Sequence, residues 1–313
     1  MAAAGRRKRG RMPDNPDRLA HLSGMEAHLR QAIRGQDHVL PRIASVFVRG
    51  ELGLAEPTRP RGSLLLCGPT GTGKTETVTC ATNYVFGHGH LVCFDMSEYQ
   101  DRAAVNKLLG EDRSDAGLLG RALTAIPSGT LLFDETEKAH TLVLDLFLQM
   151  LWHARITVAT GQTFDLSSHY VAFTSNLGGA EAMRMEQSKL ASIEQAVLRR
   201  IGGSFRPELV GRIDEKLVFA RLSPEVQREI CGLVVAAESA RLRGLGYDLE
   251  VSREALDFMV RQGHDSLLGA RPMRRAVEGH LQRAVVASLM TAGTACGRVV
   301  VAGQGAGLII EPA

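Results

Sequence analysis

The sequence predicts an α/β domain with a doubly wound parallel sheet, followed by a smaller helical domain. Short apolar runs alternate with segments in which apolar residues recur at helical spacing, and this alternation is typical of a parallel sheet. A glycine-rich loop joins the first of these runs to a helix, and helical patterns predominate after residue 222. The length of 313 residues is enough for one large domain and one smaller domain.

Composition and charge narrow the class of protein. Apolar residues make up 44% and charged residues 23% of the chain, as in an ordinary globular protein. The net charge of +3 is too small to argue for a nucleic-acid partner. We interpret the basic run at residues 6–11 as part of a disordered tail over residues 1–15; the alternative is an anchor to nucleic acid or anionic lipid.

Two further sequence patterns concern the cellular compartment in which the protein is found. The chain contains no apolar run long enough to predict a membrane span. The basic tail is not followed by the apolar segment of a signal peptide. The five cysteines are scattered and form no C-x-x-C pair, which indicates a reducing compartment and argues against structural zinc. We therefore expect the protein in the cytoplasm.

The most informative stretch is residues 63–75, which read S-L-L-L-C-G-P-T-G-T-G-K-T. A short apolar strand leads into G-x-x-x-x-G-K-[ST], the pattern of a phosphate loop whose backbone N–H groups cradle phosphates at the start of a helix. Lys74 would reach the terminal phosphates, and the hydroxyl of Thr75 would ligate Mg²⁺. The sequence thus predicts that one segment binds a nucleoside triphosphate: Gly68, Pro69, Thr70, Gly71, Thr72, Gly73, Lys74, Thr75 and Glu76.

The other elements of the large domain, residues 16–221, follow in order. Before the loop, residues 16–49 have helical spacing with a break at Gly35. After the loop we expect alternating helices and buried strands, at residues 75–85, 91–94, 103–109, 118–125, 130–133, 142–152 and 169–174. Polar residues follow the expected strands, at the sheet edge where parallel sheets bind ligands.

Residues 222–313 are expected to form the small domain. Ser223 is a suitable cap for a helix at 225–237, with Pro224 at the first helical position. A polar linker, two further helices and a closing strand pair should follow, at residues 253–262, 272–290, 298–301 and 307–310.

Several polar residues have the chemistry that hydrolysis of a nucleoside triphosphate needs. Asp134 and Glu135 directly follow an apolar strand, so Asp134 would hold Mg²⁺ and Glu135 would polarise the attacking water. Asn176 ends another strand and would donate to the γ-phosphate or to the water; the alternative is an Asx turn. Arg212 and Arg271 would add positive charge at the transition state, although either residue could instead be a surface ion-pairing arginine.

Six motifs occur in one order along the chain: residues 64–75, D-M-S-E-Y (95–99), L-L-F-D-E-T-E-K-A-H (131–140), F-T-S-N-L-G (173–178), F-R-P-E-L-V-G-R-I-D (205–214) and G-A-R-P (269–272). This order resembles the Clp chaperone family of AAA+ ATPases, and most of all the second ATPase module of ClpB-like disaggregases. The resemblance implies an α/β ATPase domain with a C-terminal helical lid, assembled as a homo-oligomeric, hexameric ring.

The resemblance also implies roles for individual residues. Arg212 would act as the finger delivered into the site of a neighbouring subunit, and Arg271 as the lid sensor that reads the γ-phosphate. Ile33 and Arg34 lie in I-R-G-Q, which resembles the adenine-contacting motif of the family, and Ile230 would contact the other side of the base. The loop, magnesium, water and sensor roles fall on the residues already named: Lys74, Thr75, Asp134, Glu135 and Asn176.

One loop departs from the family pattern. Clp unfoldases carry an aromatic pore loop, typically G-Y-V-G, whose tyrosine grips the substrate. The corresponding interval, residues 108–123, contains no aromatic residue, and its central part reads E-D-R-S-D. Such a tip cannot stack on a translocating side chain as tyrosine does.

Two functions remain in competition after this comparison. The first is a Clp-type ATPase that couples ATP hydrolysis to remodelling of a protein partner or complex. The alternative is a nucleotide-controlled assembly switch or scaffold without threading activity, similar to torsins and activated by a partner. A third interpretation, a ring that acts on nucleic acid through the basic tail, has less support because the net charge is small.

Overall fold

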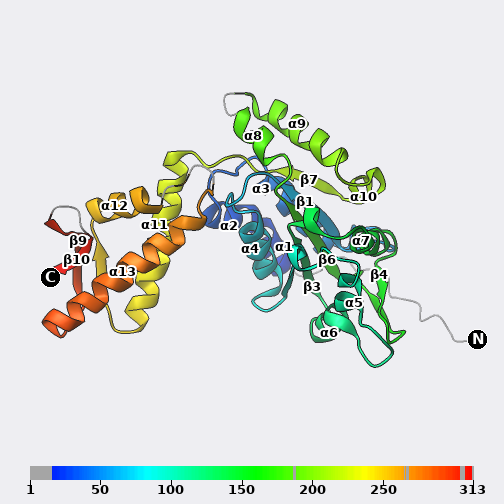
Figure 1. Cartoon of the computed structure of the whole chain (residues 1–313), viewed down its shortest axis with the longest axis horizontal. Helices are drawn as coiled ribbons and strands as arrows, with labels where there is room; N and C mark the ends of the chain where they lie inside the picture. Colours follow the sequence, from blue (N-terminus) through cyan, green and yellow to red (C-terminus); the bar gives the residue numbers. More distant parts are fainter. Residues whose placement is uncertain (1–15, 186–187, 264, 266–267, 304–306, 312–313) are drawn as a thin grey trace, which may run out of the picture. The chain divides into compact units, whose positions relative to one another are not determined.

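A computed structural model describes residues 16–185, 188–263, 265, 268–303 and 307–311 (Figure 1). The tail predicted at residues 1–15 lies outside the described residues. Contacts divide the chain into two units. The first contains the chain up to Phe219 except for Pro69–Gly73, and the second contains Pro69–Gly73 and the chain from Ala220 on. The domain boundaries at residues 16–221 and 222–313 stay predictions.

The first unit is built on a parallel sheet. Within the described residues this sheet has five strands in the order β2-β3-β6-β1-β7, and each neighbouring pair is parallel. The four strands predicted from apolar runs are confirmed, whereas β7 is not predicted because it reads E-K-L-V. The strands are β1 (Gly62–Cys67), β2 (Leu91–Asp95), β3 (Gly129–Asp134), β6 (His169–Ser175) and β7 (Glu215–Val218).

Strand β2 corrects one expectation. The apolar run at residues 91–94 predicts a buried strand, but Cys93 is exposed and, within the strand, only Phe94 is buried. In the sheet of the described residues β2 lies at the edge and pairs with β3 alone, so one of its sides is not covered by a neighbouring strand.

Helices precede and connect these strands. The helix expected after the phosphate loop begins at Lys74 and is confirmed, but the helical pattern before the loop divides at Gly24 as well as near Gly35. Helices α8 to α10 and a hairpin are not predicted. The first-unit elements are α1 (Pro16–Ser23), α2 (Met25–Ala32), α3 (Leu40–Glu51), α4 (Lys74–Phe86), η1 (Met96–Glu98), α5 (Ala104–Leu109), α6 (Gly117–Ala125), η2 (Thr136–Lys138), α7 (Thr141–His153), β4 (Arg155–Thr157), β5 (Thr163–Asp165), α8 (Gly179–Arg184), α9 (Leu190–Gly202) and α10 (Pro207–Arg212).

The sheet separates two apolar cores because alternate residues of a strand point to opposite faces. Leu65 of β1 and Phe173 of β6 pack in one core with residues of α5, α6, α7, α9 and α10. Leu64 and Ala172, their neighbours in sequence, pack in the other core with residues of α2, α3 and α4. Helices therefore cover both faces, as a doubly wound fold requires.

The second unit combines helices with a small sheet. Within the described residues that sheet has three strands in the order β10-β9-β8. The predicted strand pair is confirmed as β9 and β10, which are antiparallel, whereas β8 is not predicted. The elements are α11 (Pro224–Gly244), β8 (Leu249–Val251), α12 (Arg253–Gly263), α13 (Arg271–Ala292), β9 (Gly297–Val301) and β10 (Leu308–Glu311). In the described part of the chain no helix has both the length and the apolar character needed to cross a bilayer.

Helix α11 is longer than the sequence predicts. Ser223 caps it as expected, because its hydroxyl accepts the N–H of Val226 at 3.3 Å. The polar linker expected after residue 237 is wrong, since the helix continues to Gly244. Within this stretch Leu242 is buried, and the Arg241 guanidinium pairs with the carboxylate of Glu238 at 2.7 Å. The polar residues belong to a packed helix rather than to a linker.

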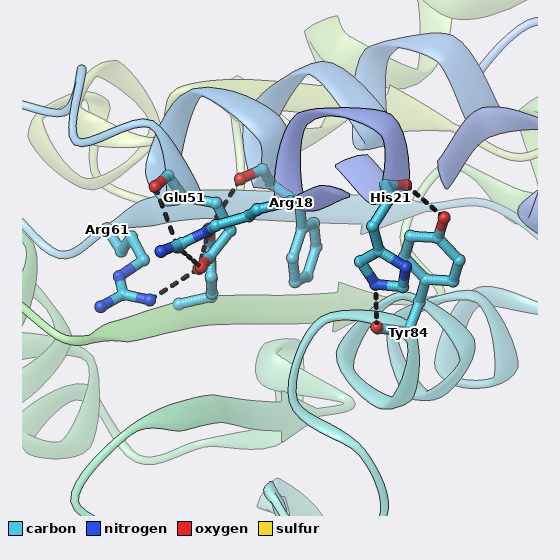
Figure 2. A network of polar contacts seen from close by, with 7 residues as sticks. Arg18, His21, Glu51, Arg61 and Tyr84 are labelled. Atoms are coloured by element: carbon cyan, nitrogen blue, oxygen red, sulfur yellow. Dashed lines mark hydrogen bonds and ion pairs between the residues drawn. The ribbon is translucent and has the colours of Figure 1, made fainter. Parts of the chain in front are cut away.

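A buried carboxylate joins the N-terminal helices to the sheet (Figure 2). Glu51, at the end of α3, accepts hydrogen bonds from Arg18 at 2.8 Å, Arg61 at 2.6 Å and the hydroxyl of Tyr170 at 3.1 Å. The same hydroxyl donates to the carbonyl oxygen of Phe47 at 2.8 Å, and burial raises the pKa of Tyr170 well above its ordinary value. The network therefore ties α1 and α3 to strand β6.

Replacing Glu51 with alanine should lower the free energy of unfolding of the first unit by about 3 kcal/mol, because it leaves the two arginines without their shared carboxylate. Urea unfolding can be followed through Trp152, the one tryptophan of the chain, which lies in α7 of the first unit. The control is Glu56→Ala, since Glu56 pairs with Arg59 while 62% exposed. That variant should lose less than about 1 kcal/mol. Equal losses in the two variants would contradict the assigned role of Glu51.

Candidate active site

The phosphate-loop residues follow the carboxyl end of β1, as the sequence predicts. Gly68 has φ 135°, and a Cβ at this position would lie 2.5 Å from the carbonyl oxygen of Phe219, so only glycine fits. Gly71 and Gly73 also have positive φ, 72° and 96°. The turn from β1 into α4 therefore requires the glycines that the motif supplies.

Lys74 is the first residue of α4 and is 7% exposed. Its Nζ donates to the carbonyl oxygen of Gly68 at 2.8 Å and to Oδ1 of Asn176 at 3.0 Å. Burial lowers the pKa of Lys74 to about 8, while neighbouring negative groups, Asp134 among them, oppose this shift. The ammonium lies in a partly desolvated position where an anionic ligand would stabilise its charge.

Asp134 lies at the end of β3, next to two hydroxyl groups. Thr75 Oγ1 donates to the Asp134 carboxylate oxygens at 3.3 and 3.4 Å, and the Thr174 hydroxyl donates to Asp134 Oδ1. Thr174 Oγ1 in turn accepts the backbone N–H of Glu135 at 3.0 Å. One threonine at the end of β6 therefore orients both members of the acidic pair.

The donor set of Thr75 and Asp134 fits Mg²⁺. This ion takes oxygen ligands, keeps several waters and is held in nucleotide sites by one or two protein groups together with the phosphates. Within the described residues no group of three or more histidine, cysteine, aspartate or glutamate side chains could hold a metal ion. A hydroxyl and a carboxylate at the phosphate loop therefore suit a metal that arrives with its nucleotide.

Glu135 has left-handed backbone geometry, with φ 55°, which is uncommon for a residue other than glycine. Its carboxylate accepts a hydrogen bond from Asn176 Nδ2 at 3.2 Å and pairs with Lys138 Nζ at 2.5 Å. Asn176 thus donates to Glu135 with one end of its amide and accepts from Lys74 with the other. Asn176, which we expect to sense the γ-phosphate, therefore links two other predicted residues. They are Lys74, expected to bind the phosphate, and Glu135, expected to polarise the water.

Three neighbours of this cluster are absent from the sequence prediction. Glu137 Oε1 accepts the backbone N–H of Asn176 at 3.0 Å, and its buried Oε2 has no hydrogen-bond partner among the described residues. Lys138 and Thr174 contact the acidic pair as described above. All three lie in the motifs that supply the predicted residues, D-E-T-E-K and F-T-S-N, so position within these motifs is the signal that could have found them.

The remaining predicted residues belong to other elements of the chain. Ile33 follows α2 and is buried in the core shared with α3 and α4, and Arg34 is next to it. Arg212 ends α10, where its guanidinium lies over the ring of a tryptophan rather than in the cluster. Ile230 in α11 and Arg271 at the start of α13 belong to the second unit. Their roles in nucleotide binding stay predictions.

The fold and this cluster define a P-loop nucleotide-binding domain followed by a helical domain. Residues 59–216 match the AAA domain (Cdc48 subfamily), and residues 222–301 match the C-terminal D2-small domain of ClpB protein. The chain belongs to the AAA+ family of ATP hydrolases. The fold class and the family resemblance predicted from the six motifs are confirmed.

Curated relatives are ClpB and Hsp100 chaperones. The chain is 35% identical to Heat shock protein 100 of Trypanosoma brucei brucei, over 85% of this chain and 31% of the relative. It is also 35% identical to Chaperone protein ClpB of Meiothermus ruber, over 91% of this chain and 34% of the relative. The chain therefore spans about one third of the length of these relatives. A closed-state cryo-EM reconstruction of Hsp104 with ATPγS and FITC casein matches 95% of this chain and 52% of its own, with TM-score 0.85 and 29% identity.

The pKa of Lys74 should make nucleotide affinity depend on pH. The ammonium attracts phosphates and the neutral amine does not, and bound phosphates would raise the pKa from about 8 towards its ordinary value. The dissociation constant for ADP, measured in EDTA to exclude metal ions, should therefore rise about tenfold between pH 7 and pH 9. Lys74→Met should bind more weakly and show little change over this range. An equally flat profile for the wild type would refute the assignment.

Proposed function

We propose that this chain binds ATP with Mg²⁺ and couples its hydrolysis to the remodelling of a protein partner or complex. The observation that carries the proposal is the double hydrogen bond of Asn176, which joins Lys74 to Glu135 beside the Thr75–Asp134 pair. The AAA+ family membership and the chaperone relatives support the same activity.

Each residue of the cluster has a distinct part in the proposed reaction. Lys74 and the backbone N–H groups of the loop bind the phosphates, and Thr75 and Asp134 hold the metal. Mg²⁺ neutralises charge on the phosphate oxygens when it is bound. Glu135 polarises the attacking water, and Asn176 donates to the γ-phosphate or to that water. Glu76 and the loop residues 68–73 complete the phosphate contacts, while Ile33, Arg34 and Ile230 contact the adenine.

A ring of identical subunits would complete this site. Arg212 would reach the nucleotide of the adjoining subunit, and Arg271 would read the γ-phosphate from the helical domain. The family resemblance supports a hexamer. As part of the same proposal we place the protein in the cytoplasm, because its five cysteines are all free thiols.

ATP turnover per subunit should rise with protein concentration, because each site needs an arginine from its neighbour. Arg212→Ala should lower the turnover of the assembled protein by about a thousandfold, the effect typical of an arginine finger. Glu135→Gln should abolish turnover and leave nucleotide binding intact, which binding titrations would verify. Unchanged turnover in Glu135→Gln would sink the ATPase mechanism. Full turnover in Arg212→Ala would refute the site shared between subunits but not the ATPase mechanism.

The loop between α5 and α6 favours a second candidate function, the nucleotide-controlled switch or scaffold without threading. Residues 110–116 contain no aromatic side chain. The carboxylates of Asp112 and Asp115 accept hydrogen bonds within the loop, from Ser114 and from the N–H of Gly117 at 2.9 Å. The loop is therefore polar and braced by its own side chains, with no group that could wedge behind an apolar chain.

A substrate assay separates the two functions. If the chain remodels a bound partner without threading, unfolded casein should not stimulate its ATP turnover. A fluorescent protein fused to casein should also keep its fluorescence in the presence of the chain and ATP. Arg113→Tyr, which returns an aromatic residue to the exposed tip, is the matched variant and should gain casein stimulation if the loop faces a pore. Robust unfolding by the wild type would exclude the switch.

A further inference from the structure

The side chain of Arg212 is stacked on the one tryptophan of the chain. The guanidinium carbon lies 3.5 Å from the centroid of the Trp152 ring. A cation within about 6 Å of an aromatic ring is attracted by its quadrupole, and tryptophan is the strongest partner. Arg212 ends α10 and Trp152 lies near the end of α7, so this contact joins two helices of the first unit.

Packing in the apolar core does not explain why residue 152 is a tryptophan. Its neighbours Met150 and Leu151 are buried, at 0% and 1% exposure, and belong to the apolar core of the first unit. Trp152 is 48% exposed and lies outside that core. A large aromatic side chain is therefore kept at the surface, where its documented contacts are with the guanidinium and with the ring of His153.

The backbone on either side of Arg212 is already fixed. At the start of α10, Arg206 pairs with Asp145, which lies seven residues before Trp152 and hence on the same face of α7. At the other end, Lys216 Nζ donates to the carbonyl oxygens of Ile213 at 2.9 Å and Val210 at 3.4 Å. What remains to be ordered is the side chain of Arg212, one of the residues with the greatest rotamer entropy.

We propose that Trp152 is a positioning residue for Arg212, a role that rests on the proposed transfer of Arg212 into the site of an adjoining subunit. The ring covers one face of the guanidinium and restricts its rotamers. The five N–H donors lie in the plane of the group, so stacking leaves its edge available to phosphate oxygens. Trp152 thereby presents an ordered arginine to the nucleotide of the neighbour.

The contact itself can be tested without ring assembly, because Trp152 is the sole tryptophan. Acrylamide should quench the fluorescence of Arg212→Ala more strongly than that of the wild type, since removal of the guanidinium uncovers one face of the indole. Arg199→Ala, which removes another arginine of the first unit, is the control and should quench like the wild type. Equal quenching in Arg212→Ala and the wild type would overturn the proposal.

The positioning role predicts a graded effect on turnover. Trp152→Leu should lower the ATP turnover of the assembled protein about two- to fivefold, and Trp152→Phe should retain an intermediate rate, because phenylalanine is the weaker cation–π partner. The dissociation constant for ATP and the assembly profile in sedimentation should stay at wild-type values, whereas a merely structural role would change stability or assembly. Leu142→Ala, an exposed apolar residue at the start of the same helix, should leave turnover unchanged.

The outcomes separate this inference from the proposed function. If Arg212→Ala abolishes turnover but Trp152→Leu matches the wild type, the positioning role is wrong and the shared site stands. If Arg212→Ala keeps full turnover in the assembled protein, the shared site fails and the positioning role fails with it. If Trp152→Phe is as slow as Trp152→Leu, stacking is not the cause and the inference is overturned.

Discussion

The site depends on the parallel register of three strands. Cys67 of β1 lies opposite Ser175 of β6, and Phe173 of β6 lies opposite Phe133 of β3. The residues that follow each strand therefore start at one edge of the sheet, which is why the amide of Asn176 reaches groups from two other strand ends. A shift of one residue in either pairing would turn the side chains to the opposite face and exchange the contents of the two apolar cores.

The two ends of β6 have different tasks. The hydroxyl of Tyr170, near its amino end, donates hydrogen bonds to Glu51 and to the carbonyl oxygen of Phe47 and so anchors the N-terminal helices. Asn176, just past its carboxyl end, belongs to the cluster with Lys74 and Glu135. Lys74 in that cluster is buried at a cost that lowers its pKa, and Glu135 adopts a left-handed backbone. Such unfavourable features persist where the surrounding structure supports them, and here the fully buried strand supplies that support.

Much of the fold and of the site could be predicted because the signals are local. The phosphate loop, the acidic pair after an apolar strand and the strand–helix alternation are each contained in a short segment of sequence. Strand β7 could not be predicted, since E-K-L-V becomes a strand only by pairing with β1. For the same reason the contact of Trp152 with Arg212 has no sequence signal: it joins residues far apart in the chain, and a tryptophan that follows Met150 and Leu151 resembles one more apolar residue of the helix.

Helix α7 gives the cluster and Arg212 a common support. The chain passes from Glu135 through the turn η2 directly into α7, and Trp152 lies at the far end of that helix. With 13 residues α7 is about 20 Å long, so it separates Glu135 from the indole of Trp152. In the proposed function Glu135 acts on the nucleotide of its own subunit, and the arginine stacked on Trp152 acts on the nucleotide of the neighbouring subunit. The inner face of this helix is packed in the apolar core by Val143, Phe147 and Met150, so one packed element holds both the segment after Glu135 and the side chain of Trp152. The position of α7 therefore fixes that of Trp152, and through the stacking contact it restricts the guanidinium of Arg212 as well.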